Sequence, residues 1–189
     1  MGQDADDLVP QSEGLSPHPA AMSIVAYVAV VGPGESASRD AIADATEIGT
    51  LIAQRGWITL TGGRRAGVMA AAAAGARTAG GIAIGLLPGD DRRDAAPELS
   101  AALPTGLGEA RNAVLVTAAD AIVACGINAG TVSEIALALR ANKPTVLVKA
   151  SPSAAEFLSS IAAGAPFEVV ATPAEAIDWV VAQMTSAPH

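Results

Sequence analysis

The chain has 189 residues, of which 51% are apolar, a composition that excludes a disordered or fibrous protein and fits one domain with a sizeable core. Its formal net charge is −8 and no basic run extends beyond Arg64-Arg65 and Arg92-Arg93, which argues against a nucleic-acid partner because polyanion binding needs a basic face. A single cysteine, Cys125, and two histidines near the chain ends exclude a disulfide within the chain, a cysteine-based zinc cluster and the Ser-His-Asp and Cys-His arrangements of hydrolases, and we expect no metal site.

Residues 1–22 are polar, acidic and proline-bearing, and they lack the basic start and apolar stretch of a signal peptide. We expect a flexible leader over 1–22, a folded domain over 23–189 and a cytoplasmic protein. No apolar run is long enough to cross a bilayer, so no membrane partner is expected.

The remaining chain alternates between strand and helix patterns. A valine-rich apolar run over 24–31 is typical of a strand buried on both faces of a parallel sheet, and helical spacing of apolar residues predicts a helix over 36–55. Further strands are predicted over 57–63, 81–89, 120–126, 143–150 and 167–172, helices over 66–80, 107–118, 130–142, 151–164 and 173–186, and a polar loop over 90–100. This alternation predicts a single α/β domain with a three-layer, doubly wound parallel sheet, Rossmann-like in architecture.

Three of the predicted strand-to-helix turns contain glycine: "VGPGES" at 31–36, "TGGRRAG" at 61–67 and "CGINAGT" at 125–131. Glycine lets a ligand approach the backbone closely, and the helix that follows offers unpaired N–H groups and a positive dipole end. Ligands of such sheets bind beyond the carboxyl ends of the strands. The three turns together predict a binding site for a phosphate-bearing, nucleotide-like small molecule. Each turn taken alone fits a simple tight turn equally well.

Two charged residues have both a structural and a functional interpretation. The segment from Thr131 to Glu134 fits a capping box, in which the glutamate binds the backbone at the helix start. Arg111 fits a surface cation or an ion-pair partner. Cys125 ends an apolar run and is expected to be a buried small side chain rather than a nucleophile.

The order and spacing of three segments are more specific than any one turn. "TGGRRAGVMAAAAAGARTAGG", "GLGEARNAVLVTAADAIVACG" and "NAGTVSEIALALRANKPTVLV" together resemble the Lonely Guy (LOG) superfamily, often labelled lysine decarboxylase-like, over about residues 24–150. LOG enzymes are phosphoribohydrolases with a GGGxxGxM turn and a PGGxGTxxE turn. The "GLGEARN" segment resembles more closely the bacterial branch related to molybdenum-cofactor carrier proteins.

The resemblance assigns roles to individual residues. Gly62, Gly63, Gly67 and Met69 match the first motif, and Gly130, Thr131 and Glu134 match the second. Arg64 replaces the third glycine of the first motif, and Ile127 and Asn128 stand where the second motif has two glycines. Arg111 and Glu134 fall where LOG enzymes place their active arginine and glutamate. The resulting candidate ligand-binding set is Gly32, Gly62, Gly63, Arg64, Arg111, Asn112, Gly126, Asn128, Gly130, Thr131 and Glu134.

Two functions remain open for this site. A carrier or sensor would bind a nucleotide-like ligand, such as the molybdenum cofactor, without chemistry and would require no other cofactor. A LOG-like phosphoribohydrolase would cleave the N-glycosidic bond of nucleoside 5′-monophosphates, with Glu134 acting on the sugar and Arg111 orienting the ribose phosphate. A pyridoxal decarboxylase is disfavoured, because nothing around Lys143 or Lys149 indicates a Schiff-base site.

The helix predicted over 130–142 carries a wide apolar stripe made of Val132, Ile135, Ala136, Leu137 and Leu139. This stripe exceeds what one sheet-facing side needs, and LOG-like proteins pair. We therefore expect a homodimer or a larger homo-oligomer.

Overall fold

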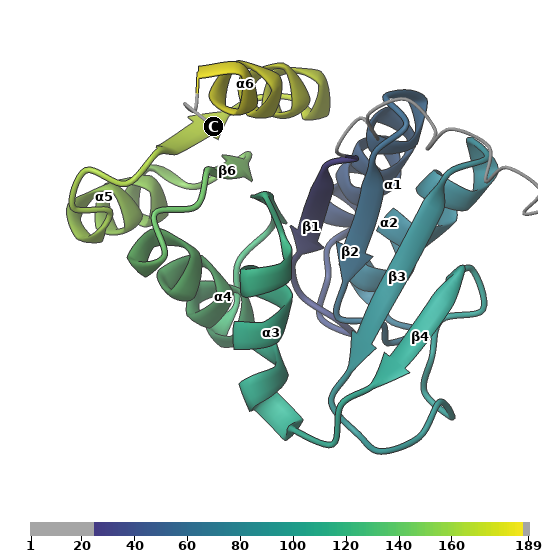
Figure 1. Ribbon diagram of the computed structural model, residues 1–189. Coiled ribbons are helices and arrows are strands. Elements are labelled where there is room, and N and C mark those ends of the chain that lie inside the picture. The colour runs from purple at the N-terminus through teal and green to yellow at the C-terminus, as the bar shows by residue number, and fades with distance from the viewer. Residues whose placement is uncertain (1–24, 187–189) are drawn as a thin grey trace, which may run out of the picture.

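The computed structural model describes residues 25–186, which form one sheet of seven parallel strands with helices on both faces (Figure 1). The leader predicted over 1–22 lies outside the described residues. The strands are β1 (Tyr27–Val31), β2 (Ile58–Thr61), β3 (Ile82–Leu87), β4 (Ala101–Pro104), β5 (Ala121–Cys125), β6 (Thr145–Val148) and β7 (Phe167–Val170). The helices are α1 (Arg39–Gln54), α2 (Gly67–Thr78), α3 (Arg111–Ala118), α4 (Ala129–Arg140), α5 (Pro152–Ile161) and α6 (Pro173–Ser186), with a short 3₁₀ turn η1 (Gly108–Ala110).

The strand order is β4-β3-β2-β1-β5-β6-β7, and every neighbouring pair is parallel. Strands β2, β3 and β4 follow one another on one side of β1. Strands β5, β6 and β7 follow one another on its other side. The winding therefore reverses between β1 and β5, which is where such sheets bind ligands. The predicted doubly wound α/β fold is confirmed.

The core has two apolar layers, one on each face of the sheet. Helices α1, α2 and α6 pack against the face that carries Val28, Val30 and Val123. Helices α3, α4 and α5 cover the opposite face, which carries Val31 and Ile122. Strands β5 and β6 are buried along their whole length, as is β1 after Tyr27, because both faces of the central strands are covered. Among the described helices, none combines the length and apolarity that crossing a membrane requires.

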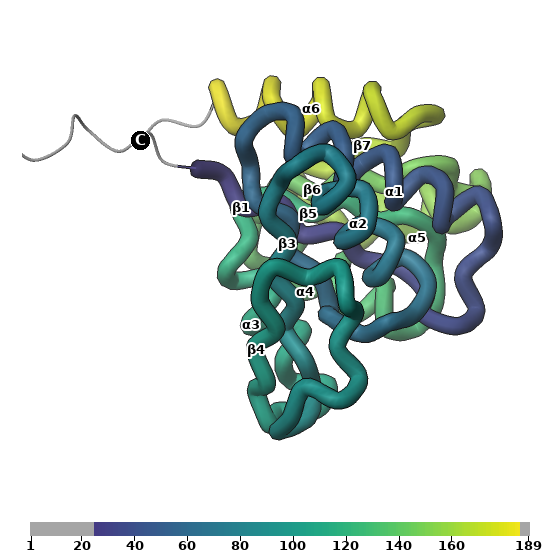
Figure 2. The backbone as a smooth tube through the Cα atoms, turned by 90° about the vertical axis from the view of Figure 1, so that its right-hand side faces the viewer, coloured from purple at the N-terminus to yellow at the C-terminus, as the bar shows by residue number. Residues whose placement is uncertain are grey.

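Glycine residues allow α1 and α2, which cover the same face of the sheet, to come into close contact. Figure 2 shows the two helices side by side. A Cβ at Gly49 would stand 2.1 Å from the Ala72 carbonyl oxygen, and one at Gly75 would stand 2.0 Å from the Thr46 carbonyl oxygen. Both distances are far inside van der Waals contact. The alanine- and glycine-rich composition thus allows two helices to pack almost backbone to backbone.

The sequence prediction was incomplete between β3 and α3. The sequence predicts no helix or strand over residues 101–104, yet they form β4, an edge strand that pairs with β3 between Ile84 and Leu87. This strand is only four residues long and none of its side chains is fully buried, so it carries no clear apolar pattern. The helix predicted over 107–118 also begins later, as η1 followed by α3, because Gly106 and Gly108 have positive φ values that a right-handed α-helix excludes.

Candidate ligand-binding site between β1 and β5

A cavity of about 130 Å³ lies at the carboxyl ends of β1 and β5, where the winding of the sheet reverses. Nine of the eleven residues predicted from the sequence line it: Gly32, Gly62, Arg64, Arg111, Asn112, Asn128, Gly130, Thr131 and Glu134. The turns after three strands and the first residues of α3 and α4 therefore meet at one place. Positions far apart in the sequence, such as Gly32 and Glu134, become neighbours through the parallel order of the strands.

The other two predicted residues, Gly63 and Gly126, are not part of the cavity lining. Gly63 has a φ of 77° and its added Cβ would lie 3.0 Å from the Cα atom of Gly85. Gly126 has a φ of 80° and directly follows β5. Both glycines are required by the local backbone. Conversely, Gly34 and Glu109 line the cavity, although the predicted set omitted them. Both lie in segments that the sequence analysis had singled out, "VGPGES" and "GLGEARN", and could have been included on that ground.

Arg111 and Glu134, which both line the cavity, form a buried ion pair. The Arg111 Nη1 atom lies 3.3 Å from Glu134 Oε1, and each side chain is only 9% exposed. Arg111 is the first residue of α3 and Glu134 lies one turn into α4, so the contact between these two helices sets the geometry of the pair. Of the two interpretations of Arg111, the ion-pair partner is the correct one.

Gly62 leaves room for this arginine. A Cβ at position 62 would lie 2.7 Å from Arg111 Nη2, 2.8 Å from Nη1 and 2.6 Å from the sulfur of Met69. The backbone of the β2 turn therefore lies directly against the guanidinium group. This explains in physical terms why the motif has glycine there: the residue gives space to a cation.

The capping-box prediction for Thr131 and Glu134 is wrong. The helix begins three residues earlier, and its N-cap is Asn128, whose Oδ1 accepts hydrogen bonds of 2.9 Å from both the backbone N–H and the hydroxyl of Thr131. Asn128 is a strong N-cap residue by nature. Glu134 is consequently not needed at the helix start and contacts Arg111 instead.

Burial changes the acidity of the carboxyl group in this site. Removal from water raises the pKa of Glu134 to about 7, which the nearby Arg111 opposes and the carboxylate of Glu109 reinforces. Near neutral pH the buried pair therefore exchanges between an ionised and a neutral glutamate.

Two buried side-chain atoms, one in Arg111 and one in the adjacent Asn112, have no hydrogen-bond partner. Asn112 donates from Nδ2 to the Ser133 hydroxyl at 3.2 Å, but its Oδ1 atom, like the Nε atom of Arg111, is buried without a hydrogen bond. Across the part of the chain that the structure describes, the only other such side-chain atom is Thr59 Oγ1. Buried polar groups in proteins are almost always satisfied, so a free donor and a free acceptor on two consecutive residues that line the cavity favour a polar ligand there.

The thiol of Cys125, at the end of β5, takes no part in the site. It is fully buried, and burial raises its pKa to about 12. The group stays protonated at neutral pH, which confirms the prediction of a packed, unreactive side chain.

Comparisons with known proteins agree with this fold. Residues 25–177 match the model of the SLOG cluster4 family. The molybdenum cofactor binding protein of Rippkaea orientalis is 36% identical, with a TM-score of 0.82 over 85% of this chain and 98% of that one. The molybdenum cofactor carrier protein of Chlamydomonas reinhardtii is 40% identical, with a TM-score of 0.80 over 86% of this chain and 99% of that one. An uncharacterized protein of Archaeoglobus fulgidus is 32% identical over 82% of this chain and 93% of its own length.

The motifs that resemble the LOG superfamily are thus matched by an independent family model that covers most of the chain, and the same region carries the sheet and the cavity. The suspected relationship is confirmed. The chain belongs to the SLOG cluster4 family.

Proposed function

We propose that this protein binds the molybdenum cofactor, a phosphate-bearing pterin, in the cavity between β1 and β5 and acts as its carrier. The observation that carries the proposal is that Arg111 and Asn112, two consecutive residues that line the cavity, each have a buried polar atom without a hydrogen bond, Nε and Oδ1 respectively. A ligand phosphate accepts from the arginine and from the N–H groups at the start of α4. A pterin ring offers N–H groups, which donate to Asn112.

The identity of the ligand is supported by the two similar proteins that bind or carry this cofactor. Their identities of 36% and 40% extend over nearly their entire chains and over 85% and 86% of this chain. A phosphate and a nitrogen-rich ring also match the free donor and the free acceptor of the cavity. The residues that would hold the cofactor are Arg111, Asn112 and Gly130.

The proposal is tested by purifying the protein from cells that synthesise the cofactor and oxidising the bound material to its fluorescent pterin products. We expect pterin fluorescence from the wild type, and none from an Arg111→Met variant prepared in parallel. Mass spectrometry of the small molecules released by denaturation gives an independent identification. A wild-type preparation that neither retains pterin nor takes up added cofactor would contradict the proposal.

Phosphoribohydrolysis is the second candidate, and the Arg111–Glu134 pair is the observation that favours it. Cleavage of an N-glycosidic bond passes through an oxocarbenium-like state, which an ionised carboxylate stabilises. A glutamate whose pKa is about 7 and which is bonded to an arginine is only partly available for that role at neutral pH. Carrier function therefore remains the better fit.

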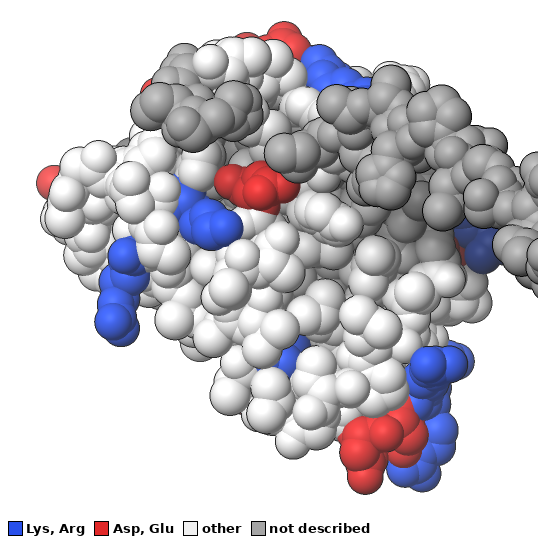
Figure 3. Space-filling model, in the orientation of Figure 1, with Lys and Arg blue, Asp and Glu red and all other residues white. Residues whose placement is uncertain are grey.

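We also propose that the protein forms a homodimer or a larger homo-oligomer through the face formed by α3, α4 and α5. This face is mostly uncharged (Figure 3) and exposes Val114, Phe157 and Ile161. Ile135 and Leu139 of the predicted stripe are core residues, whereas Val132, Ala136 and Leu137 remain partly exposed.

Light scattering at micromolar concentration should give at least twice the mass of one chain. Val114→Asp should shift the protein toward the monomer, because it places a charge in a desolvated interface. A wild type that is monomeric at this concentration would refute the assignment.

A further inference from the structure

The cavity between β1 and β5 is too small to hold the whole of a cofactor-sized ligand. Its volume of about 130 Å³ compares with about 300–1,000 Å³ for ordinary small-molecule sites. Two larger hollows adjoin it. One, of about 360 Å³, lies over the turn after β1 and includes Gly34, Glu35 and Asn128. The other, of about 340 Å³, lies against the loop between β3 and β4 and is called the loop cavity below.

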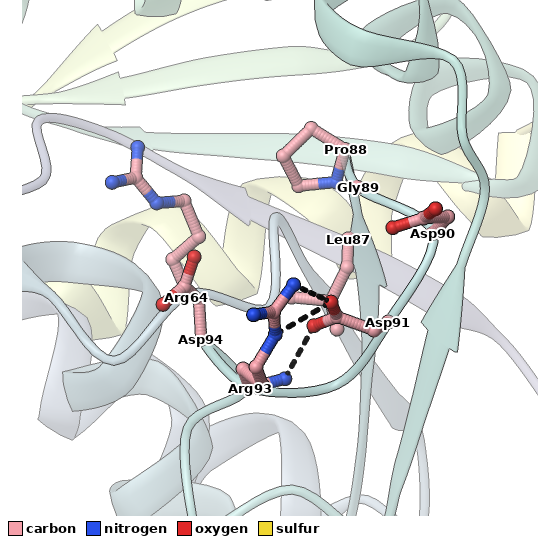
Figure 4. Close-up of a pocket in the computed structure, with 8 residues that line it drawn as sticks. All are labelled: Arg64, Leu87, Pro88, Gly89, Asp90, Asp91, Arg93 and Asp94. Atoms are coloured by element: carbon pink, nitrogen blue, oxygen red, sulfur yellow. Dashed lines mark hydrogen bonds and ion pairs between the residues drawn. The ribbon is translucent and has the colours of Figure 1, made fainter.

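Arg64 lines all three cavities and so stands at their junction. Its backbone is fixed: residue 64 pairs with Ala95 across the loop, and the neighbouring Arg65 N–H donates to the Asp94 carbonyl oxygen at 3.0 Å. Its side chain is exposed and has no hydrogen bond or ion pair within residues 25–186. Figure 4 shows the guanidinium group extending away from the Asp91–Arg93 pair.

Arg64 and Arg111 therefore present two guanidinium groups to the same cavity, one at the rim and one buried. Arg111 is engaged by Glu134 through Nη1, whereas Arg64 carries a free positive charge. Guanidinium groups bind phosphate oxygens in a forked geometry. One phosphate of a ligand would contact the buried guanidinium group, and a second phosphate joined to it would contact the group at the rim.

The loop cavity differs from the cavity between β1 and β5 in that carboxylates, rather than free guanidinium groups, contribute most of its charged lining. Arg93 is already tied to Asp91, with hydrogen bonds of 2.8 Å from its backbone N–H and 2.7 Å from Nε, so its charge is neutralised locally. Asp90 and Asp94 also line the cavity (Figure 4). These carboxylates repel further phosphate but accept hydrogen bonds from hydroxyl and N–H groups, as acidic residues do from ribose in dinucleotide sites.

We propose that the ligand site continues past Arg64 into the loop cavity and takes a ligand in which a nucleoside is joined through a diphosphate to the group held between β1 and β5. The first phosphate lies at Arg111, the second at Arg64, and the sugar hydroxyls and base of the nucleoside at Asp90 and Asp94. This inference rests on the proposed ligand-binding function and deepens it, because it names the chemical class of the ligand.

The test compares three probes by isothermal titration calorimetry at fixed ionic strength: AMP, ADP and diadenosine 5′,5′-diphosphate. We expect the wild type to bind the dinucleoside diphosphate about tenfold or more tightly than AMP, since each added charge-assisted contact contributes on that scale. Arg64→Ala should reduce this preference to less than about threefold. The double variant Asp90→Asn/Asp94→Asn should lose the preference for the dinucleoside diphosphate over ADP.

Arg92→Ala is the matched control. It removes a positive charge from the same loop, but Arg92 does not line the loop cavity, so the preference should persist. If the wild type binds the dinucleoside diphosphate no better than AMP, or if Arg64→Ala keeps the preference, the inference is overturned while cofactor binding stands. Undetectable binding of the dinucleoside diphosphate by protein that does bind the molybdenum cofactor overturns the inference alone; failure of both overturns the proposed function as well.

Discussion

Arg111→Met is expected to weaken binding of the phosphate-bearing ligand by roughly 30-fold to several-thousand-fold. Removing one partner of a buried, charge-assisted contact costs about 2–5 kcal/mol, and every 1.4 kcal/mol is about tenfold in affinity. Methionine keeps most of the side-chain volume, so the contact with Gly62 remains filled. The affinity is measured by titration calorimetry with the purified cofactor or with AMP.

The fold should survive this substitution. Loss of the arginine leaves Glu134 buried without a countercharge, but the pKa of this glutamate is already about 7, and the carboxyl group then stays protonated instead of buried as an anion. Arg39→Met is the control, because it removes the same charge from an exposed position that does not line the cavity. Binding by Arg111→Met within threefold of the wild type would show that the phosphate lies elsewhere.

Glu134→Gln is expected to remove a pH dependence of ligand binding. In the wild type, the ionised carboxylate holds Arg111 and repels the ligand phosphate, so affinity should rise as the pH falls from 8 to 6.5, by at most about tenfold per pH unit. Glutamine mimics the protonated form. The variant should therefore bind at pH 8 with the affinity that the wild type reaches only at lower pH, and its affinity should stay flat across this range.

The same variant separates the two candidate functions. If the protein is a phosphoribohydrolase, the wild type releases free base from AMP, GMP, CMP or a cytokinin nucleotide, and Glu134→Gln lowers that rate by about 10²–10⁴-fold. If it is a carrier, chromatography detects no base with either protein. Glu156→Gln, which changes an exposed carboxylate on α5, is the control. Base release that persists undiminished in Glu134→Gln would refute the role of this residue in catalysis.

The free energy of unfolding should depend on pH through Glu134. Because the pKa of Glu134 is raised on folding, the folded protein binds the proton more tightly than the unfolded chain. The wild type therefore loses stability, relative to Glu134→Gln, as the pH rises from about 4.5 to about 7, by an amount on the order of 3 kcal/mol. Urea unfolding at several pH values measures the difference, and parallel curves for the two proteins would contradict the assigned burial effect.

The parts of the fold that the sequence predicted are those with a local cause. Strands β1, β5 and β6 are buried on both faces, so their apolar runs are continuous and easy to recognise. The turn glycines mark the carboxyl edge of the sheet. Strand β4 has no such signal, because it exists only through its pairing with β3 and buries little of its own surface.

The candidate site could also be predicted from the sequence only in part. The resemblance to the LOG superfamily placed Arg111 and Glu134 in one site, while local sequence alone favoured a cap for Glu134. The cap was wrong because the helix begins at Ala129 and its N-cap is Asn128, a role that the sequence analysis did not consider for this residue. Neither the raised pKa of Glu134 nor the role of Gly62 in giving space to Arg111 follows from sequence, since both depend on which helices come together.

Strand β4 also has a consequence for the solution behaviour of the protein. Open parallel sheets end in edge strands, whose unpaired backbone groups can recruit another chain and begin aggregation. Here one edge is only four residues long and ends in Pro104, which has no N–H to offer an incoming strand. The β4 edge therefore offers few free backbone groups with which a strand of another chain could pair.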